Sequence, residues 1–209
     1  MMTRRGGVRR RCARAIARAI LGALILAGCD EDNPFRATPE DVLTGESQVW
    51  ELGLSAFPSA YDFARGERFF LSNLRGPGRD PLTGRIVGDW ALDARADGTL
   101  ILRPLSTLAP ELVVTRTGIQ DLGAILFDSV LEAPADGYSA ADDSLGVPVV
   151  AGHVYAFRIS DLSQIGTPLN YAKLEVIEVG QEIPGDPRSR FIRFRWAYQR
   201  QPLNRRLVE

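Results

Sequence analysis

Few side chains of this sequence carry the chemistry that catalysis or metal binding needs. It holds one histidine, His153, and two cysteines, Cys12 and Cys29. One histidine excludes a two-histidine HExxH metal site, and the sequence has no G-x-S-x-G elbow and no glycine-rich phosphate loop. The adjacent acids Asp142 and Asp143 lie in a stretch rich in Gly, Ser and Ala, where a solvated loop is the expected role. We therefore expect a protein that is not an enzyme.

His153 follows Gly152 directly and opens an apolar alternating stretch. Its position has two interpretations. In the first, it is a histidine at a strand end, exposed or bonded to the backbone. In the second, it is an axial ligand of a metal or a haem.

Cys29 closes an N-terminal segment with the pattern of a secretory signal peptide. Residues 1–28 contain seven arginines and no acid, and they end in the uncharged run Ala19–Gly28. That run is too short to span a bilayer, which takes about 20 apolar residues. An uncleaved membrane anchor and a buried core helix are the alternatives.

The four residues that end this segment, Leu26-Ala27-Gly28-Cys29, resemble the lipobox of bacterial lipoproteins. The resemblance implies that residues 1–28 are removed and that Cys29, as the new first residue, carries lipid. The expected location is then the bacterial cell envelope, with the protein anchored in membrane lipid through Cys29. The membrane is either the outer membrane or the periplasmic face of the inner membrane.

Removal of residues 1–28 changes the charge balance of the chain. The full sequence has 25 Lys+Arg and 26 Asp+Glu, so the loss of seven arginines leaves 18 cations against 26 acids, a formal net charge of −8. An acidic protein lacks the general attraction to phosphate that nucleic-acid binding needs, so we expect no nucleic-acid partner. With Cys12 removed and Cys29 lipidated, no disulfide or cysteine-ligated zinc remains possible.

The remaining chain divides into an acidic tether and one folded domain. Residues 29–47 have no apolar periodicity and predict a lipidated, flexible, solvated tether. Residues 48–209 are short apolar stretches separated by Gly, Pro and Asp, which leave little room for long helices. They predict a single all-β domain, an antiparallel β-sandwich.

The clearest strands lie in the last third, where apolar and polar residues alternate. Tyr155, Phe157 and Ile159 share one face. In the final strand, Ile192, Phe194, Trp196 and Tyr198 should face the core, with Arg193 and Arg195 on the other face. Glu175 and Glu178 are expected to pair with these arginines. The remaining expectations are a hairpin over 90–102 around Asp97-Gly98, strands over 112–115 and 124–127, and a turn over 119–123.

Six short motifs follow one another along the chain: Phe63–Glu67, Asp89–Leu92, Ala133–Tyr138, His153–Arg158, Tyr171–Val176 and Phe191–Phe194. In this order they resemble the HmuY family of haem-binding bacterial lipoproteins. The resemblance covers roughly residues 55–200 and implies an all-β lipoprotein domain that binds haem.

The sequence departs from that family at the haem ligands. The family's axial ligands lie in a long insertion before the strand that corresponds to 154–159, and here only residues 139–152 fill the gap, without histidine or methionine. The available candidates are His153 and the family turn residue Tyr138, which could ligate iron only if its ring is not packed. Two functions follow as expectations: binding of haem or another flat ligand, or a non-catalytic structural or interaction role with an envelope protein as partner.

Overall fold

A computed structural model of the chain describes residues 41–53, 56–71, 86, 88–162, 166 and 168–208. The signal segment and the predicted tether as far as residue 40 lie outside the described residues, and Ala37–Glu209 form one compact unit. The described elements are β1 (Val42–Trp50), β2 (Ala60–Asp62), β3 (Glu67–Phe69), β4 (Trp90–Ala94), β5 (Leu100–Pro104), the 3-10 helix η2 (Leu105–Thr107), β6 (Thr115–Gly123), η3 (Phe127–Ser129), β7 (Val147–Pro148), β8 (Val154–Asp161), β9 (Leu169–Gln181), η4 (Pro187–Ser189) and β10 (Arg190–Gln199).

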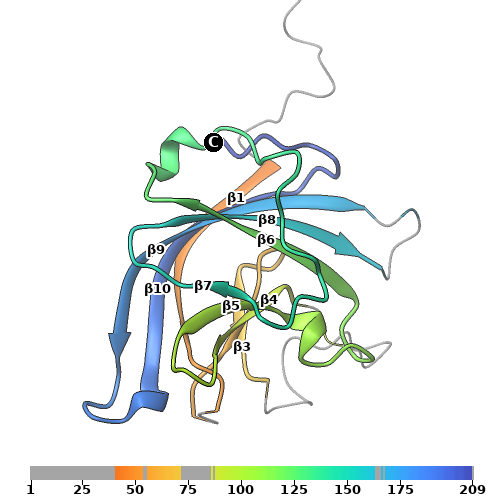
Figure 1. Cartoon of the computed structure of the whole chain (residues 1–209). Coiled ribbons are helices and arrows are strands. Elements are labelled where there is room, and N and C mark those ends of the chain that lie inside the picture. The colour runs from red at the N-terminus through yellow and green to blue at the C-terminus, as the bar shows by residue number, and fades with distance from the viewer. Residues whose placement is uncertain are drawn as a thin grey trace, which may run out of the picture. The chain divides into compact units, whose positions relative to one another are not determined.

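These strands form two five-stranded antiparallel sheets (Figure 1). Sheet A has the order β1-β10-β9-β8-β6, and sheet B has the order β3-β2-β4-β5-β7. One hydrophobic cluster draws its residues from both sheets, so the sheets pack face to face. The prediction of an all-β antiparallel sandwich is confirmed.

Large aromatic rings fill the space between the sheets. The ring of Phe194 in sheet A lies 5.1 Å from that of Tyr61 and 5.3 Å from that of Trp90, both in sheet B, with each pair meeting edge to face. Trp196 packs against Tyr61 at 5.8 Å, and Phe157 belongs to the same cluster. The predicted core faces of β8 and β10 are therefore correct.

The opposite face of sheet A, here called its outer face, carries the predicted charge pairs. Arg193 Nη2 lies 3.1 Å from Glu178 Oε2, and Arg195 Nε donates to Glu175 Oε2. Both pairs follow from the antiparallel register of β9 and β10.

The predicted tether extends too far along the chain. Residues 42–47 lie in β1, where Val42 pairs with Gln199 and Ser47 with Phe194 of β10. Backbone pairing with the last strand orders this polar stretch, so the folded domain begins before residue 48.

The strand pattern predicted between 112 and 127 is also wrong. Residues 119–123 belong to the nine-residue strand β6, which a bulge and Gly123, at φ +79°, bring to its end. Val113 makes only an isolated bridge, to Ile86, and residues 124–127 lead into η3. The predicted hairpin of β4 and β5 around Asp97-Gly98 is confirmed, with Gly98 at φ +86°.

Two segments cover part of the outer face of sheet A. Phe127 and Val130, at η3, pack on Val42, Val154 and Ala197. Farther along, Ala133 and Leu207 pack on Tyr171. The C-terminal segment pairs with residues 131–133, because Leu207 N donates to Leu131 O and Ala133 N to Arg205 O, each at 2.8 Å.

Candidate functional site

His153 precedes β8 directly, and its side chain is bonded to a carboxylate. Its Nδ1 lies 3.0 Å from both carboxylate oxygens of Asp121, near the end of β6. The imidazole is 25% exposed. His153 therefore lies at a strand end, as the first interpretation expects, but its partner is a side chain rather than the backbone.

Tyr138 is packed and hydrogen-bonded within the protein. Its hydroxyl donates to the carbonyl oxygen of Pro134 at 3.0 Å, and the guanidinium of Arg158 lies 5.1 Å from the ring centroid. A Cβ added at Gly118 would come within 3.0 Å of Tyr138 Cβ, which explains the glycine within β6. Burial raises the pKa of the Tyr138 phenol, so the phenolate that iron prefers is disfavoured.

The fold places these two candidates on opposite faces of sheet A. Asp121, the partner of His153, pairs with Tyr155, whose side chain is fully buried between the sheets. Arg158, which lies over Tyr138, is three positions farther along β8 and therefore faces the other way. The two residues do not fit a haem with two axial ligands.

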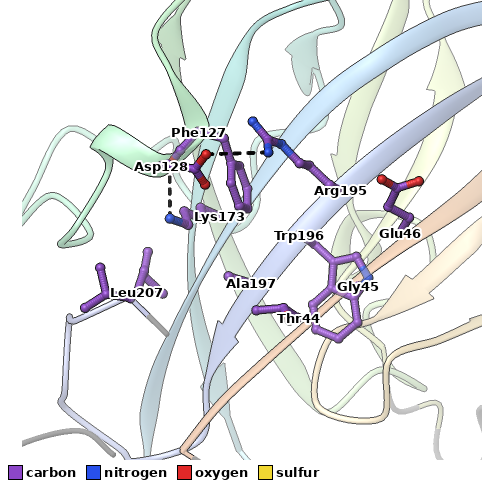
Figure 2. A pocket seen from close by; sticks show the side chains of 11 residues that line it. Thr44, Gly45, Glu46, Phe127, Asp128, Lys173, Arg195, Trp196, Ala197 and Leu207 are labelled. Atoms are coloured by element: carbon purple, nitrogen blue, oxygen red, sulfur yellow. Dashed lines mark hydrogen bonds and ion pairs between the residues drawn. The ribbon is translucent and has the colours of Figure 1, made fainter. Parts of the chain in front are cut away.

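A groove of about 470 Å³ opens on the outer face of sheet A (Figure 2). Its lining comes from β1, η3, β9, β10 and the C-terminal segment: Thr44, Gly45, Glu46, Phe127, Asp128, Lys173, Arg195, Trp196, Ala197, Leu207 and Val208. Neither His153 nor Tyr138 contributes to it. Its lining is mixed, with apolar side chains beside two acids and two cations.

Phe127 lies between the two cations of this groove (Figure 2). Lys173 Nζ is 4.2 Å from the ring centroid, and the Arg195 guanidinium carbon is 4.4 Å from it. Such contacts contribute most where the cation is shielded from water. The aromatic ring thereby joins η3 to the outer face of β9 and β10.

Lys173 is the only lysine of the sequence, and its side chain is buried. Its Nζ donates to the carbonyl oxygens of Phe127 and Val130, each at 3.0 Å. These bonds satisfy the carbonyl groups at and just after η3, which the sheet cannot reach. Lys173 is therefore the residue that holds the wall of the groove in place.

Arg195 and Asp128 give the groove its polar rim. Arg195 donates to Glu175 and lies 3.7 Å from Asp128, measured from Nη1 to Oδ2. The side chain of Asp128 is 83% exposed and that of Arg195 is 35% exposed. The rim can thus offer one guanidinium and one solvated carboxylate to a ligand.

Two buried acids do not line this groove. Asp62 is the last residue of β2, and Asp89 directly precedes β4. Asp89 Oδ2 accepts a hydrogen bond from Phe63 N at 2.8 Å, and Asp62 Oδ1 accepts one from Arg65 N at 3.2 Å. Burial, followed by the charge of Asp62, raises the pKa of the Asp89 carboxyl well above its usual range. The pKa of Asp62 is raised as well, mainly by burial.

The sequence patterns indicate neither the groove nor this acid pair. Residues of the groove come from five separate parts of the chain, and Phe127 falls in a stretch that the sequence predicts as a strand. A lone lysine within an alternating strand was the one visible signal, and alternation by itself predicts a solvated side chain there.

The part of the chain that the structure describes contains no cluster of three His, Cys, Asp or Glu residues able to hold a metal ion. No helix among the described residues has the length and apolar character to cross a bilayer. Comparisons of the chain with protein-family models, with curated proteins and with solved structures gave no match.

Proposed function

We propose that this chain is a non-catalytic binding protein of the bacterial envelope, anchored in a membrane by lipid on Cys29. The observation that carries the binding role is the outer-face groove, which combines an apolar wall at Phe127 and Leu207 with the charged rim of Arg195 and Asp128. Pockets of this kind orient a ligand with a few polar groups while apolar surface supplies affinity. Lys173 is bonded to backbone carbonyls, and Arg195 is paired with Glu175 and Asp128. Both cations are therefore held in place beside the apolar wall, which suits a binding site rather than proton transfer.

The ligand class that this groove fits is a flat or elongated amphiphile with an anionic group. An apolar body would lie against Phe127 and Leu207, and the anionic group would meet Arg195 at the rim. This proposal keeps the flat-ligand expectation of the sequence and moves the binding site from His153 and Tyr138 to the groove, which neither residue lines.

The groove can be tested with anilinonaphthalene sulfonate, a flat anionic fluorophore. Thr44 is exposed and lines the groove, so Thr44→Trp should block it and weaken binding by about five-fold or more. Gln48→Trp is the matched control, because Gln48 lies four residues along the same strand, on the same face, and outside the groove lining. Equal binding by both variants and the parent would reject the groove as the site.

The anchor is tested separately. Cys29→Ser should abolish incorporation of radiolabelled palmitate and release the protein from the membrane fraction. Palmitate in the variant at the level of the parent would contradict the lipobox interpretation, whatever the groove binds.

Haem binding through His153 alone is the second candidate, and one contact favours it. A carboxylate on Nδ1, as Asp121 provides, is the usual orienting partner of a histidine that binds metal through Nε2. The motifs that resemble the HmuY family point the same way. Such a site would have one protein ligand on the iron.

A further inference from the structure

The structure points to a membrane-contact surface at the end of the domain where β1 begins. We propose that three exposed leucines, Leu126, Leu131 and Leu203, insert into the interface of an anionic phospholipid bilayer, and that Arg200 and Arg206 bind its phosphate groups. The inference rests on the proposed lipid anchor at Cys29 and adds a second, non-covalent contact with the same membrane.

The proposed anchor limits how far the start of the folded domain can lie from the membrane. Asp41, just before β1, is held at the C-terminal segment, because Arg200 N donates to Asp41 O at 2.8 Å and Gln201 Nε2 donates to Asp41 Oδ2 at 2.7 Å. Eleven residues lie between Cys29 and Asp41. Fully extended, the chain from Cys29 to Asp41 spans at most roughly 40 Å. A lipid on Cys29 would thus hold Asp41 within that distance of the bilayer.

Exposed apolar side chains gather at this same end. Leu126 is 77% exposed, Leu203 is 74% exposed and Leu131 is 54% exposed. They belong to two segments that the structure joins, since Leu207 N donates to Leu131 O. Figure 1 shows η3, the start of β1 and the C-terminal segment together at one end of the sandwich. Exposed apolar clusters of this kind mark surfaces that are covered in the working protein.

Leu203 is held outward by an uncommon backbone conformation. Its φ is +65°, the one positive φ at a non-glycine residue among the described residues. Its N–H donates to Leu169 O at 2.7 Å, and the neighbouring Asn204 donates from its side chain to Gln201 Oε1 at 3.0 Å. Glycine or asparagine normally occupies this conformation, so a leucine there is unfavourable, and its exposed side chain gains no compensating burial in the core.

The charge around Leu203 matches an anionic lipid surface. Residues 199–209 contain three arginines, Arg200, Arg205 and Arg206, and one acid, Glu209. Arg200 and Arg206 are exposed, whereas Arg205 lies 3.6 Å from Glu132. This local cationic segment stands out in a processed chain of formal net charge −8, and arginines beside apolar side chains are typical of interfacial membrane contact. A protein partner could meet the leucines, but the anchor brings a lipid surface to them first.

Vesicle flotation of the unlipidated chain from Asp30 onward tests this surface without the anchor. That chain retains every residue of the four hydrophobic clusters, which lie between Val42 and Leu207. It should float with phosphatidylcholine vesicles that contain about 30% phosphatidylglycerol, and much less with phosphatidylcholine alone. Leu126→Ser with Leu203→Ser should lower the bound fraction by about five-fold, and Arg200→Gln with Arg206→Gln should remove the preference for anionic vesicles.

Ile183→Ser is the matched control. Ile183 is 48% exposed and lies in the β9–β10 turn, with Arg188 nearby in the sequence, at the other end of a ten-residue strand from Gln199. At about 3.3 Å per residue, that end is roughly 30 Å away, and this variant should float like the parent. No flotation of the parent, or equal losses in the leucine and Ile183 variants, would overturn the proposal. Thermal melts ensure that each variant is folded.

A second measurement uses the full lipidated chain in its membrane. Cys12 and Cys29 are the only cysteines of the sequence. A polarity-sensitive fluorophore on Leu203→Cys should shift to the blue on membrane association, whereas one on Ile183→Cys should not. An unshifted spectrum at position 203 would overturn the proposal. Failure of Cys29 to incorporate palmitate would reject the anchor alone, because flotation of the unlipidated chain does not depend on it.

Discussion

The two faces of sheet A carry opposite kinds of side chain, although they belong to the same five strands. The inner face presents Phe157, Phe194 and Trp196 to the rings of sheet B. The outer face presents Lys173 and Arg195, which hold the η3 segment through hydrogen bonds, an ion pair and the ring of Phe127. The inner face supplies most of the stability, and the outer face builds a groove from parts distant in the sequence.

The largest effect should come from removal of an inner-face ring. Trp196→Ala should lower the free energy of unfolding by about 3–5 kcal/mol, because the indole is 5% exposed and packed between glycines. Cβ atoms added at Gly45 or Gly66 would lie 3.2 Å from it. Urea melts measure this loss.

Arg195→Ala, the next residue along β10, is the control on the outer face. Its ion pairs are partly exposed, so the loss should be about 1 kcal/mol or less. Losses of similar size at Trp196 and Arg195 would contradict the assignment of the two faces.

Substitution of Lys173 should give the second-largest loss of stability and should loosen the η3 segment on the outer face of sheet A. Lys173→Met keeps the apolar stem but removes the buried donor to the carbonyls of Phe127 and Val130. Phe127 O still accepts a hydrogen bond from Val130 N at 3.2 Å, whereas Val130 O loses its Lys173 donor. The expected loss is about 2 kcal/mol, within the range for a buried polar group left unsatisfied. Hydrogen exchange should increase in residues 125–131 and stay unchanged in β8. Unchanged exchange near η3 would show that Lys173 does not hold this segment.

A pH titration separates the buried acids from the exposed ones. Burial raises the pKa of Asp89, so the folded state binds a proton that the unfolded state releases. The contribution of Asp89 to stability is therefore fully present below the unfolded pKa, near 4, and is lost as the pH rises toward the folded pKa. Asp62, Asp161, Tyr61 and Tyr198 lie close enough to influence this carboxyl or be influenced by it.

Asp89→Asn should therefore be more stable than the parent at pH 8 and gain nothing at pH 4. The amide oxygen can still accept the N–H of Phe63. Asp97→Asn is the control with the opposite sign, because hydrogen bonds from Thr99 lower the pKa of Asp97. Parallel stability curves for the parent and Asp89→Asn would show that this carboxyl is not protonated in the fold.

The sequence predicted the inner face well because its signal is local. Alternation in β8 and β10 places Phe157 and Trp196 inward whatever strand pairs beside them. In β1 the same signal is hidden, since Gly45 and Ser47 are small where Trp196 and Phe194 lie opposite them. The polar appearance of residues 42–47 therefore predicted a tether, although the strand is set by a partner about 150 residues away.

The groove could not be predicted, because no local pattern specifies it. Phe127 reaches Lys173 and Arg195 only after η3 has folded back over sheet A, and the sequence predicted a strand for residues 124–127. Leu126 contributed an apolar residue to that predicted strand, although its side chain is exposed in the structure. His153 was correctly placed at a strand end, but its bond to Asp121 depends on the register between β6 and β8.

The smallest expected effect concerns haem, and it compares the candidates on the two faces of sheet A directly. Because Tyr138 is bonded to Pro134 and covered by Arg158, His153 is the one of these two candidates that is available as a ligand. Haemin should therefore either give no specific Soret shift or bind weakly, with the high-spin spectrum of a single protein ligand. His153→Ala should abolish any specific signal, and Tyr138→Phe should leave it unchanged. A tight low-spin complex that survives His153→Ala would place the ligands elsewhere in the chain and favour haem carriage over binding at the outer-face groove.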